Sequence, residues 1–421
     1  MLKVFNYKLG KVIIFLGILV NQSKAQQAIP AAYPGSSPIN YIKGWLAFAP
    51  IKEETDLLTR PSKDVRVTTI FADGLGRDIQ TVSKSGSLAT GDTATDMVIP
   101  IIYDEFGREK IKYLPYADAT NNGILKTNPF NPQVNFYNGQ LAGQIGETSA
   151  NPTIPNWAYL QTNFESSPLS RIQESFSSGY SWVGTSGQTL EANRRSVKSK
   201  YWVNTETDAV RIWTVLNSAL GSFGSYTTNA IYNAGELTKK IAIDERGYQI
   251  IEFKNRDEKV ILKKVQIKEG VSDQNGIGSG HVDWLCTYYV YDELGQLRCV
   301  IQPEAVRLMS APTPNWNLNP YLNEQCFRYE YDQRGQMILK KVLGMGHMDL
   351  IYDLKDRLVM TQDSIQRSSI PQKWSYIEYD VLNRPVATGI FALNTTAQNA
   401  RTFARGLSDY PWNHFTSYRI V

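Results

Sequence analysis

Residues 102–116 read IYDEFGREKIKYLPY, in which Tyr103-Asp104 is followed by two spacer residues and then by Gly107-Arg108. Nearly the same pattern returns in residues 291–300 (YDELGQLRCV) and 331–340 (YDQRGQMILK). Aligned on Tyr-Asp or its equivalent, six units begin at Ala72-Asp73, Tyr103-Asp104, Tyr291-Asp292, Tyr331-Asp332, Tyr352-Asp353 and Tyr379-Asp380. The last three starts are 21 and 27 residues apart. A period near twenty residues predicts a repeat architecture in which each unit is one supersecondary element.

The spacing within each unit predicts a β-hairpin turn. An aspartate at the first position of a four-residue turn accepts hydrogen bonds from turn amides, and glycine at the fourth position adopts positive φ without strain. A type I turn closed by a left-handed residue is a common hairpin connection. We expect the tyrosine to end one strand and the arginine to begin the return strand, with their planes stacked across the pair.

The departures from the pattern support a conformational role for the glycines. Asp356 and Asn383 stand where other units have glycine, and these two residue types tolerate left-handed geometry best after glycine. A loop that binds phosphate through bare glycine backbone would not tolerate that exchange. The predicted turn residues are Asp73, Gly76, Arg77, Tyr103, Asp104, Gly107, Arg108, Tyr291, Asp292, Gly295, Tyr331, Asp332, Gly335, Tyr352, Asp353, Asp356, Arg357, Tyr379, Asp380, Asn383 and Arg384.

Composition also favours β structure. Hydrophobic residues make up 42% of the chain, which is enough to build a core, and there are 24 tyrosines. Tyrosine suits pleated, half-buried surfaces. We therefore predict an all-β fold: an array of hairpins that forms a long, curved, spiralling antiparallel sheet, part of a shell, with loops rich in Pro, Asn and Gly.

The N-terminus has the order of a secretory signal peptide. The basic segment MLKVFNYKLGK precedes the apolar run VIIFLGILV, and Ser23 and Ala25 occupy the positions expected before a cleavage site. The apolar run is shorter than the roughly 20 residues that span a bilayer. We expect cleavage after Ala25, no transmembrane segment after its removal, and an exported protein, secreted or on the cell surface.

Charge and cysteine content exclude several classes. Without the four lysines of residues 1–25, 40 basic and 40 acidic residues remain, so no global charge favours nucleic acid. The three cysteines are far apart and odd in number, which fits three buried thiols or one bridge and one free thiol. No histidine or cysteine spacing typical of zinc occurs. We expect no metal site and no cofactor.

The chain divides into five predicted regions. Residues 1–25 are the signal peptide and residues 26–45 a linker rich in Pro, Ala and Ser. Residues 46–180 form an N-terminal β module with two YD-like units, and within residues 117–180 SRIQESF (170–176) is the one stretch with helical character. Residues 181–280 are a middle β region. Residues 281–421 are the YD-repeat region, with a short helix predicted in QPEAVRLMS.

These units resemble the YD repeats of Rhs-type proteins. The stretch FADGLGRDIQTV … DMVIPIIYDEFGREKIKYLPY is similar to the N-terminal domain of unknown function that opens many exported bacterial Rhs-repeat-associated core proteins. The resemblance covers most of residues 40–390. It implies a structural module of a β-shell that encloses or presents a cargo or toxin, with no catalysis by this chain. The implied partners are further repeats or a C-terminal cargo domain, in the same chain or a downstream frame.

No catalytic motif accompanies the repeats. The chain lacks HExxH, P-loop and GxSxG patterns, and GIGSGH (276–281) is not followed by a helix pattern. Carboxylates paired in space cannot be read from sequence, so an exported hydrolase is one alternative. The other is a cell-surface adhesin or glycan-binding protein whose partners are surface glycans or proteins. It would use exposed aromatics such as Trp157, Trp182, Trp202 and Trp213, for which core burial is the competing interpretation.

Overall fold

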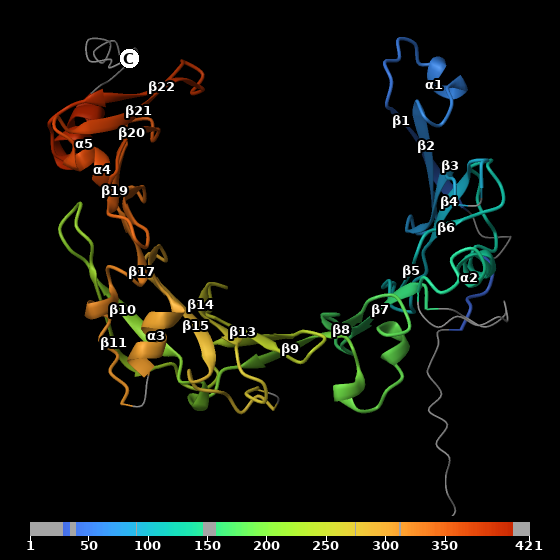
Figure 1. Ribbon diagram of the computed structural model, residues 1–421, viewed down its shortest axis with the longest axis horizontal. Helices are drawn as coiled ribbons and strands as arrows, with labels where there is room; N and C mark the ends of the chain where they lie inside the picture. The colour runs from blue at the N-terminus through green and yellow to red at the C-terminus, as the bar shows by residue number, and fades with distance from the viewer. Residues whose placement is uncertain are drawn as a thin grey trace, which may run out of the picture. The chain divides into compact units, whose positions relative to one another are not determined.

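The computed structural model describes residues 28–33, 39–89, 91–145, 157–273, 275–310 and 313–406. The predicted signal peptide, residues 1–25, lies outside the described residues. The chain divides into two compact units, Met1–Val197 and Lys198–Val421. Figure 1 shows the secondary-structure elements of both.

Unit 1 is built on antiparallel strands. Within the described residues, one sheet has the order β1-β2-β3-β4-β6, and strands β5, β7 and β8 pair with one another beside it. β1 begins at Asn40, inside the range interpreted as a linker. The elements are β1 (Asn40–Ala47), α1 (Asp56–Thr59), β2 (Val65–Ala72), β3 (Asp78–Ser87), β4 (Thr95–Pro100), β5 (Ile111–Tyr113), β6 (Tyr116–Ala117), α2 (Phe130–Asn138), β7 (Tyr159–Phe164) and β8 (Ile172–Phe176), with 3-10 turns at Val183–Thr185 and Glu191–Asn193.

Unit 1 differs from the sequence-based expectation in two places. The stretch SRIQESF is strand β8, not a helical turn, because Ile172–Phe176 pairs antiparallel with β7 and buries Phe176. The helix of this region is α2, whose Val134 and Phe136 are buried. Phe136 packs with Val82, Val98 and Tyr116 in the core of the sheet. Tertiary pairing thus decides between helix and strand where local propensity is weak.

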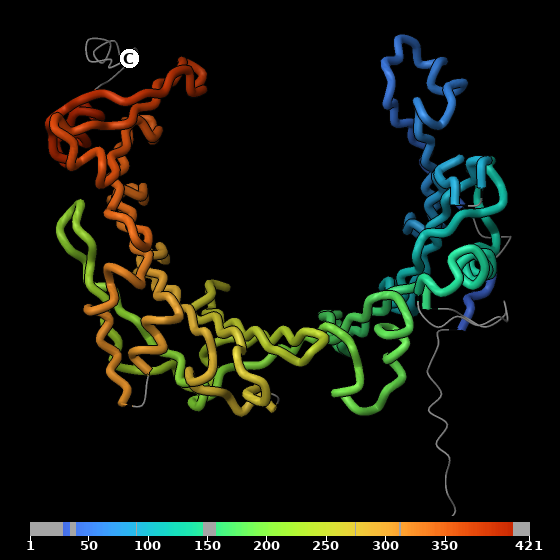
Figure 2. The backbone as a smooth tube through the Cα atoms, viewed as in Figure 1, coloured from blue at the N-terminus to red at the C-terminus, as the bar shows by residue number. Residues whose placement is uncertain are grey.

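Unit 2 is a long antiparallel meander. β9 pairs with β12, and each strand from β12 to β22 pairs with the next in sequence. Figure 2 traces this succession of hairpins from yellow-green to red. The strands are β9 (Val197–Val203), β12 (Thr238–Ile243), β13 (Gln249–Lys254), β14 (Val260–Gln266), β15 (Trp284–Tyr291), β16 (Leu297–Ile301), β17 (Cys326–Tyr331), β18 (Met337–Lys341), β19 (His347–Tyr352), β20 (Leu358–Gln362), β21 (Lys373–Tyr379) and β22 (Pro385–Ala392).

Other elements cover one face of this meander, which we call the covered face. The hairpin of β10 (Arg211–Leu216) and β11 (Ser225–Ile231) packs there, as do α3 (Pro303–Ser310) and α5 (Ala397–Gly406). The remaining short elements are α4 (Ser364–Ser368) and 3-10 turns at Glu206–Asp208 and Asn319–Tyr321. Helix α3 confirms the helix predicted in QPEAVRLMS, with Val306 and Met309 in the core.

The core of unit 2 follows from strict alternation along the strands. In β15, Trp284, Cys286, Tyr288 and Val290 are buried, and the residues between them are more exposed. Side chains alternate between the faces of a strand, so every second residue points to the covered face. Cys286, Cys299 and Cys326 are buried free thiols. The all-β prediction is confirmed. Within the described residues no helix has the length and apolar character needed to cross a membrane.

Candidate functional site

The six sequence units share one turn geometry. In each, the aspartate N–H donates to the carbonyl four residues later, as Asp332 does to Gln336 at 3.0 Å, and the fourth residue donates back to the aspartate carbonyl. Oδ1 of the aspartate accepts two further backbone N–H groups, in this unit from Arg334 at 2.9 Å and Gln336 at 3.0 Å. The side chain therefore satisfies amides that the tight turn leaves unpaired.

The fourth position is left-handed in every unit. The φ angles are 77° at Gly76, 75° at Gly107, 74° at Gly295, 77° at Gly335, 61° at Asp356 and 61° at Asn383. A side chain at such a φ meets a steric penalty that glycine avoids and that Asn and Asp tolerate. The residue types at this position are therefore those that the backbone requires.

The arginine that follows the turn binds its own aspartate. Arg108 Nε donates to Asp104 Oδ2 at 2.9 Å, and Arg357 Nε donates to Asp353 Oδ2 at 2.7 Å. Two nitrogens of each guanidinium, Nε and Nη2, converge on Oδ2, while Oδ1 accepts the turn amides, so both carboxylate oxygens are bound. The same contact closes the units at Asp73 and Asp380.

The predicted stacking of tyrosine and arginine within one unit is wrong. Arg77 lies 4.7 Å from the ring of Tyr103, and Arg357 lies 5.1 Å from the ring of Tyr379, so each stacks on the tyrosine of the following unit. The strand register explains this contact, because a bulge at Val359 pairs Tyr352 with Leu358, so that Arg357 lies opposite Asp353 and not opposite Tyr352. The arginine therefore links one hairpin to the next.

Two further turns share the geometry but escaped the sequence alignment. Asp244 N–H donates to Tyr248 O at 2.9 Å, and Asn255 N–H donates to Lys259 O at 3.0 Å. Each follows a strand that does not end in tyrosine. Gly247 has φ 90° and Glu258 has φ 58° at the fourth position. A search for Asp or Asn alone, three residues before Gly, Asn, Asp or Glu, would have found both.

The face of unit 2 opposite the covered face carries half-buried aromatic side chains, and we call it the aromatic face. Tyr289, Phe327 and Tyr329 alternate with core residues along β15 and β17, and none of them is fully buried. Tyr291, Tyr331, Tyr352 and Tyr379 end their strands on the same face. Within the described part of unit 2, helices α3 and α5 and the β10–β11 hairpin pack on the other side.

Lysines are interspersed among these aromatics. Lys240, Lys254 and Lys263 point to the aromatic face in β12, β13 and β14, beside a single glutamate, Glu252. Lys340 pairs with Tyr329 across β17 and β18. This surface therefore presents both aromatic rings and positive charge.

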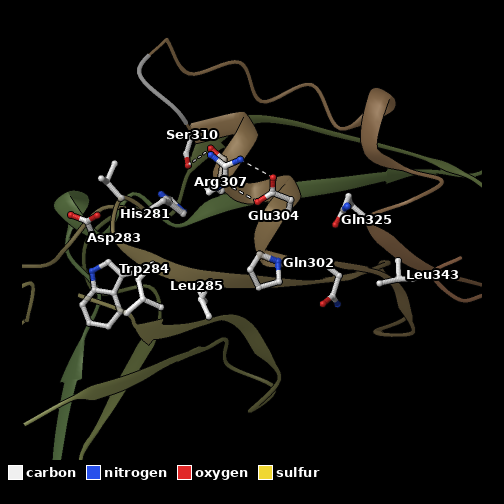
Figure 3. Close-up of a pocket in the computed structure, with 13 residues that line it drawn as sticks. His281, Asp283, Trp284, Leu285, Gln302, Glu304, Arg307, Ser310, Gln325 and Leu343 are labelled. Atoms are coloured by element: carbon white, nitrogen blue, oxygen red, sulfur yellow. Dashed lines mark hydrogen bonds and ion pairs between the residues drawn. The ribbon is translucent and has the colours of Figure 1, made fainter. Parts of the chain in front are cut away.

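A pocket of about 670 Å³ opens on unit 2 between β15 and α3. Figure 3 shows Glu304 and Arg307 pointing toward one another at its rim, where Arg307 Nε and Nη2 donate to the carboxylate at 2.7 Å each. His281 also lines it, but its Nε2 lies 2.8 Å from Tyr288 Oη. Burial lowers the pKa of His281 to about 3, so the ring is neutral near pH 7. The Glu304 carboxylate and the His281 imidazole are thus both already hydrogen-bonded within the protein.

Buried charges hold the GIGSGH loop against the covered face. Lys239 binds both Asp208 and Asp273, and all three side chains are buried. Lys264 donates to Ser279 Oγ at 2.8 Å, and Thr205 Oγ1 donates to Ile277 O at 2.6 Å. Burial lowers the pKa of Lys264 to about 8. The loop is therefore fixed by satisfied ion pairs, the arrangement that buried charges require.

Three of the four tryptophans that could form a sugar-binding platform lie in or against the cores. Trp157 is 3% exposed in unit 1, whereas Trp202 and Trp213 pack on the core of unit 2. Trp182 is half-buried. In the described ranges, no group of three or more His, Cys, Asp or Glu side chains could hold a metal ion.

Comparison with known proteins gives one family match. Residues 47–196 match a family described as a domain of unknown function (DUF6443). The match includes residues 71–116, which carry the sequence resemblance to an N-terminal domain of unknown function. No curated protein matches the chain.

Among solved structures, the chain is similar to toxin-complex proteins. The crystal structure of TcdB2-TccC3-TEV is 13% identical with a TM-score of 0.45, and the match covers 79% of this chain and 13% of that one. The Photorhabdus luminescens Tc holotoxin pore with a mutant TccC3 is 12% identical with a TM-score of 0.45, at the same coverage. TcdB2-TccC3-Cdc42 is 13% identical with a TM-score of 0.44. The chain thus spans about an eighth of the length of these structures.

Proposed function

We propose that this chain is a structural YD-repeat module of an exported Rhs-like protein, which lines a β-shell and encloses or presents a cargo polypeptide. The observation that carries the proposal is the two-sidedness of unit 2. One face of the meander is covered by α3, α5 and the β10–β11 hairpin, and the aromatic face is left to a partner. Half-buried tyrosines are the residues most suited to adaptable contact with a polypeptide.

The side chains of the repeat turns support a structural role and not a catalytic one. In the carboxylates of Asp104 and Asp353, one oxygen accepts hydrogen bonds from turn amides and the other accepts them from the arginine of the same unit. The buried Lys239 is likewise paired. Groups bound in closed pairs stabilise hairpins but are not poised for proton transfer. We therefore infer that the chain acts without catalysis and without a cofactor, and that its partners are further repeats or a C-terminal cargo.

Site-specific photo-cross-linking in the exporting cells tests this function. Tyr329→p-benzoylphenylalanine places the probe on the aromatic face, and Thr227→p-benzoylphenylalanine places it on an exposed position of β11, beyond the covered face. We expect Tyr329 to yield adducts with a polypeptide encoded beyond the repeats and Thr227 to yield none. Adducts with cell-surface glycoproteins from both positions would contradict the cargo role and favour an adhesin.

A further inference from the structure

Strand β1 is an exposed sheet edge with apolar side chains on both faces. It stands first in the order β1-β2-β3-β4-β6, and all of its eight residues are exposed. Tyr41 is 66% exposed and Trp45 37% on one face. Ile42 is 74% exposed and Leu46 56% on the other face. A long, apolar edge of this kind is a template for pairing with another strand.

The backbone groups available for such pairing can be assigned. Phe48 N–H donates to Asp64 O at 2.8 Å on the β2 side, and the β1–β2 register continues without a shift from Ala47 to Asn40. Because backbone groups alternate in direction along a strand, those of even-numbered residues point toward β2. The N–H and C=O groups of Tyr41, Lys43, Trp45 and Ala47 point away from the sheet. They have no backbone partner within the described residues.

We propose that β1 pairs antiparallel with β1 of a second copy of this chain, about a two-fold axis at Gly44. In an antiparallel ladder, a residue whose backbone groups point outward must pair with another such residue, so here odd-numbered residues pair with odd-numbered residues. The two-fold axis must therefore pass through a residue and cannot pass between two residues. Centring at Lys43 or at Gly44 gives the longest overlaps. A centre at Lys43 opposes two lysines, which is destabilising, so the Gly44 register is selected. This self-association goes beyond the proposed function.

The Gly44 register is chemically complementary on both faces. It places Lys43 opposite Trp45 of the partner subunit, and Lys43 already lies 5.5 Å from the ring of its own Trp45. It places Ile42 opposite Leu46 of the partner subunit, so the two most exposed aliphatic groups of that face cover one another. Gly44 meets its own copy at a non-hydrogen-bonded site, where strands approach most closely. A closed two-fold dimer also removes both edges at once.

Cysteine cross-linking of the purified full chain tests the register. Gly44→Cys puts two thiols at a Cα separation of about 4.5 Å, within the range that a disulfide spans. The added Cβ has room, since its nearest neighbour would be Thr68 O at 4.0 Å. Lys43→Cys is the matched control, because its two copies lie diagonally, about 7–8 Å apart. We expect oxidation to give covalent dimers of Gly44→Cys and not of Lys43→Cys; the reverse result would overturn the register.

Native mass spectrometry and light scattering test the association itself. We expect the unmodified chain to be a dimer at micromolar concentration. Leu46→Glu should raise the dimer dissociation constant by about tenfold or more, since 1.4 kcal/mol is tenfold. Leu75→Glu, at a 78% exposed turn position of the same unit, should leave the dimer intact. A monomer at every concentration would overturn the proposal, and so would an open series of oligomers, which would indicate head-to-tail pairing with another edge such as β22.

Discussion

The turns at Asp353 and Asp332 have the same backbone geometry but are closed by arginines of different origin. At Asp353 the closing cation is Arg357, four residues away. At Asp332 that position is Gln336, and the carboxylate instead binds Arg405 of α5, with Oδ2 2.6 Å from Nη2. The carboxylates are equally buried, at 5% exposure. A buried carboxylate needs a cation, and the chain supplies it either locally or from a covering helix.

The turn at Asp292 uses a third arrangement, in which the cation comes from Arg298, six residues away on the returning strand β16. Arg298 donates to Asp292 Oδ2 at 3.1 Å, binds Glu330 on β17 and donates to Asn217 Oδ1 at 2.9 Å. Glu330 also accepts the Gly224 N–H at 2.7 Å. The β10–β11 connection is thereby attached to the meander through one guanidinium. Of the six units, those at Asp292 and Asp332 lack an arginine at the fifth position, and both are linked to covering elements, the β10–β11 connection and α5.

The largest effect should follow from removing Arg298. Arg298→Met leaves the carboxylates of Asp292 and Glu330 buried without their cation, and breaking a buried pair in this way costs about 3–5 kcal/mol. We expect a matching loss in the free energy of unfolding, measured by denaturant titration. Arg384→Met is the control, because the Arg384 side chain is 71% exposed and should change stability little. Equal losses in both variants would contradict the distinction between a buried and an exposed closing arginine.

The next largest loss of stability should follow from substitutions at the left-handed turn position. The loss should be similar whether the turn is closed by its own arginine or by Arg405 of α5. Gly335→Val and Asn383→Val place a β-branched residue at positive φ, which costs about 1–2 kcal/mol. Asn383→Gly should be nearly neutral, because both residues adopt this geometry. Thermal or denaturant melts of the three variants provide the measurement. A neutral Gly335→Val beside a destabilised Asn383→Gly would refute the turn model.

Removal of Arg405 should cost less stability than the turn substitutions, because the Arg405 side chain is 39% exposed. Arg405→Met should lose about 0.5–1 kcal/mol, near the upper limit for partly exposed pairs. A double-mutant cycle with Asp332→Asn separates the ion pair from the packing of α5. If the cycle shows no coupling, Arg405 does not close this turn.

The smallest difference should appear in the pH dependence of stability, because the pKa values of Asp380 and Glu330 are shifted in opposite directions. The Arg384 backbone N–H lowers the pKa of Asp380 below its usual 3.8, so its contribution is present above that value and is lost as pH falls through the folded pKa. Burial raises the pKa of Glu330 above its usual 4.5, so its contribution is present below that value and is lost as pH rises through the folded pKa.

Unfolding titrations between pH 3 and 7 compare Asp380→Asn and Glu330→Gln with the unmodified chain. We expect the first substitution to weaken the loss of stability in acid. The second should gain stability relative to the unmodified chain as pH rises above about 4.5. If both substitutions changed the pH dependence of stability in the same direction, the predicted difference between Asp380 and Glu330 would be wrong.

Much of the fold can be predicted from sequence because the determining signals are local. An aspartate followed three residues later by glycine, asparagine or aspartate specifies the turn through hydrogen bonds within five residues. Alternation along β12–β15 and the helical pattern of QPEAVRLMS are local as well. SRIQESF has weak local propensity, so its pairing with β7 decides its structure. The turns at Asp244 and Asn255 carry neither a tyrosine before the turn nor an arginine after it, so the repeat pattern does not reveal them.

The all-β class, the places where the chain turns and the residue types at the left-handed positions can be predicted from the sequence, since each depends on contacts within a few residues. The cation that binds Asp332, the second partner of Arg298, the covered face of the meander and the open edge at β1 follow from packing between distant segments. These depend on contacts between segments such as Arg298 and Glu330, or Arg405 and Asp332, which are 32 and 73 residues apart. Their side chains meet only because burial of the covered face brings α5 and the β10–β11 hairpin onto the sheet.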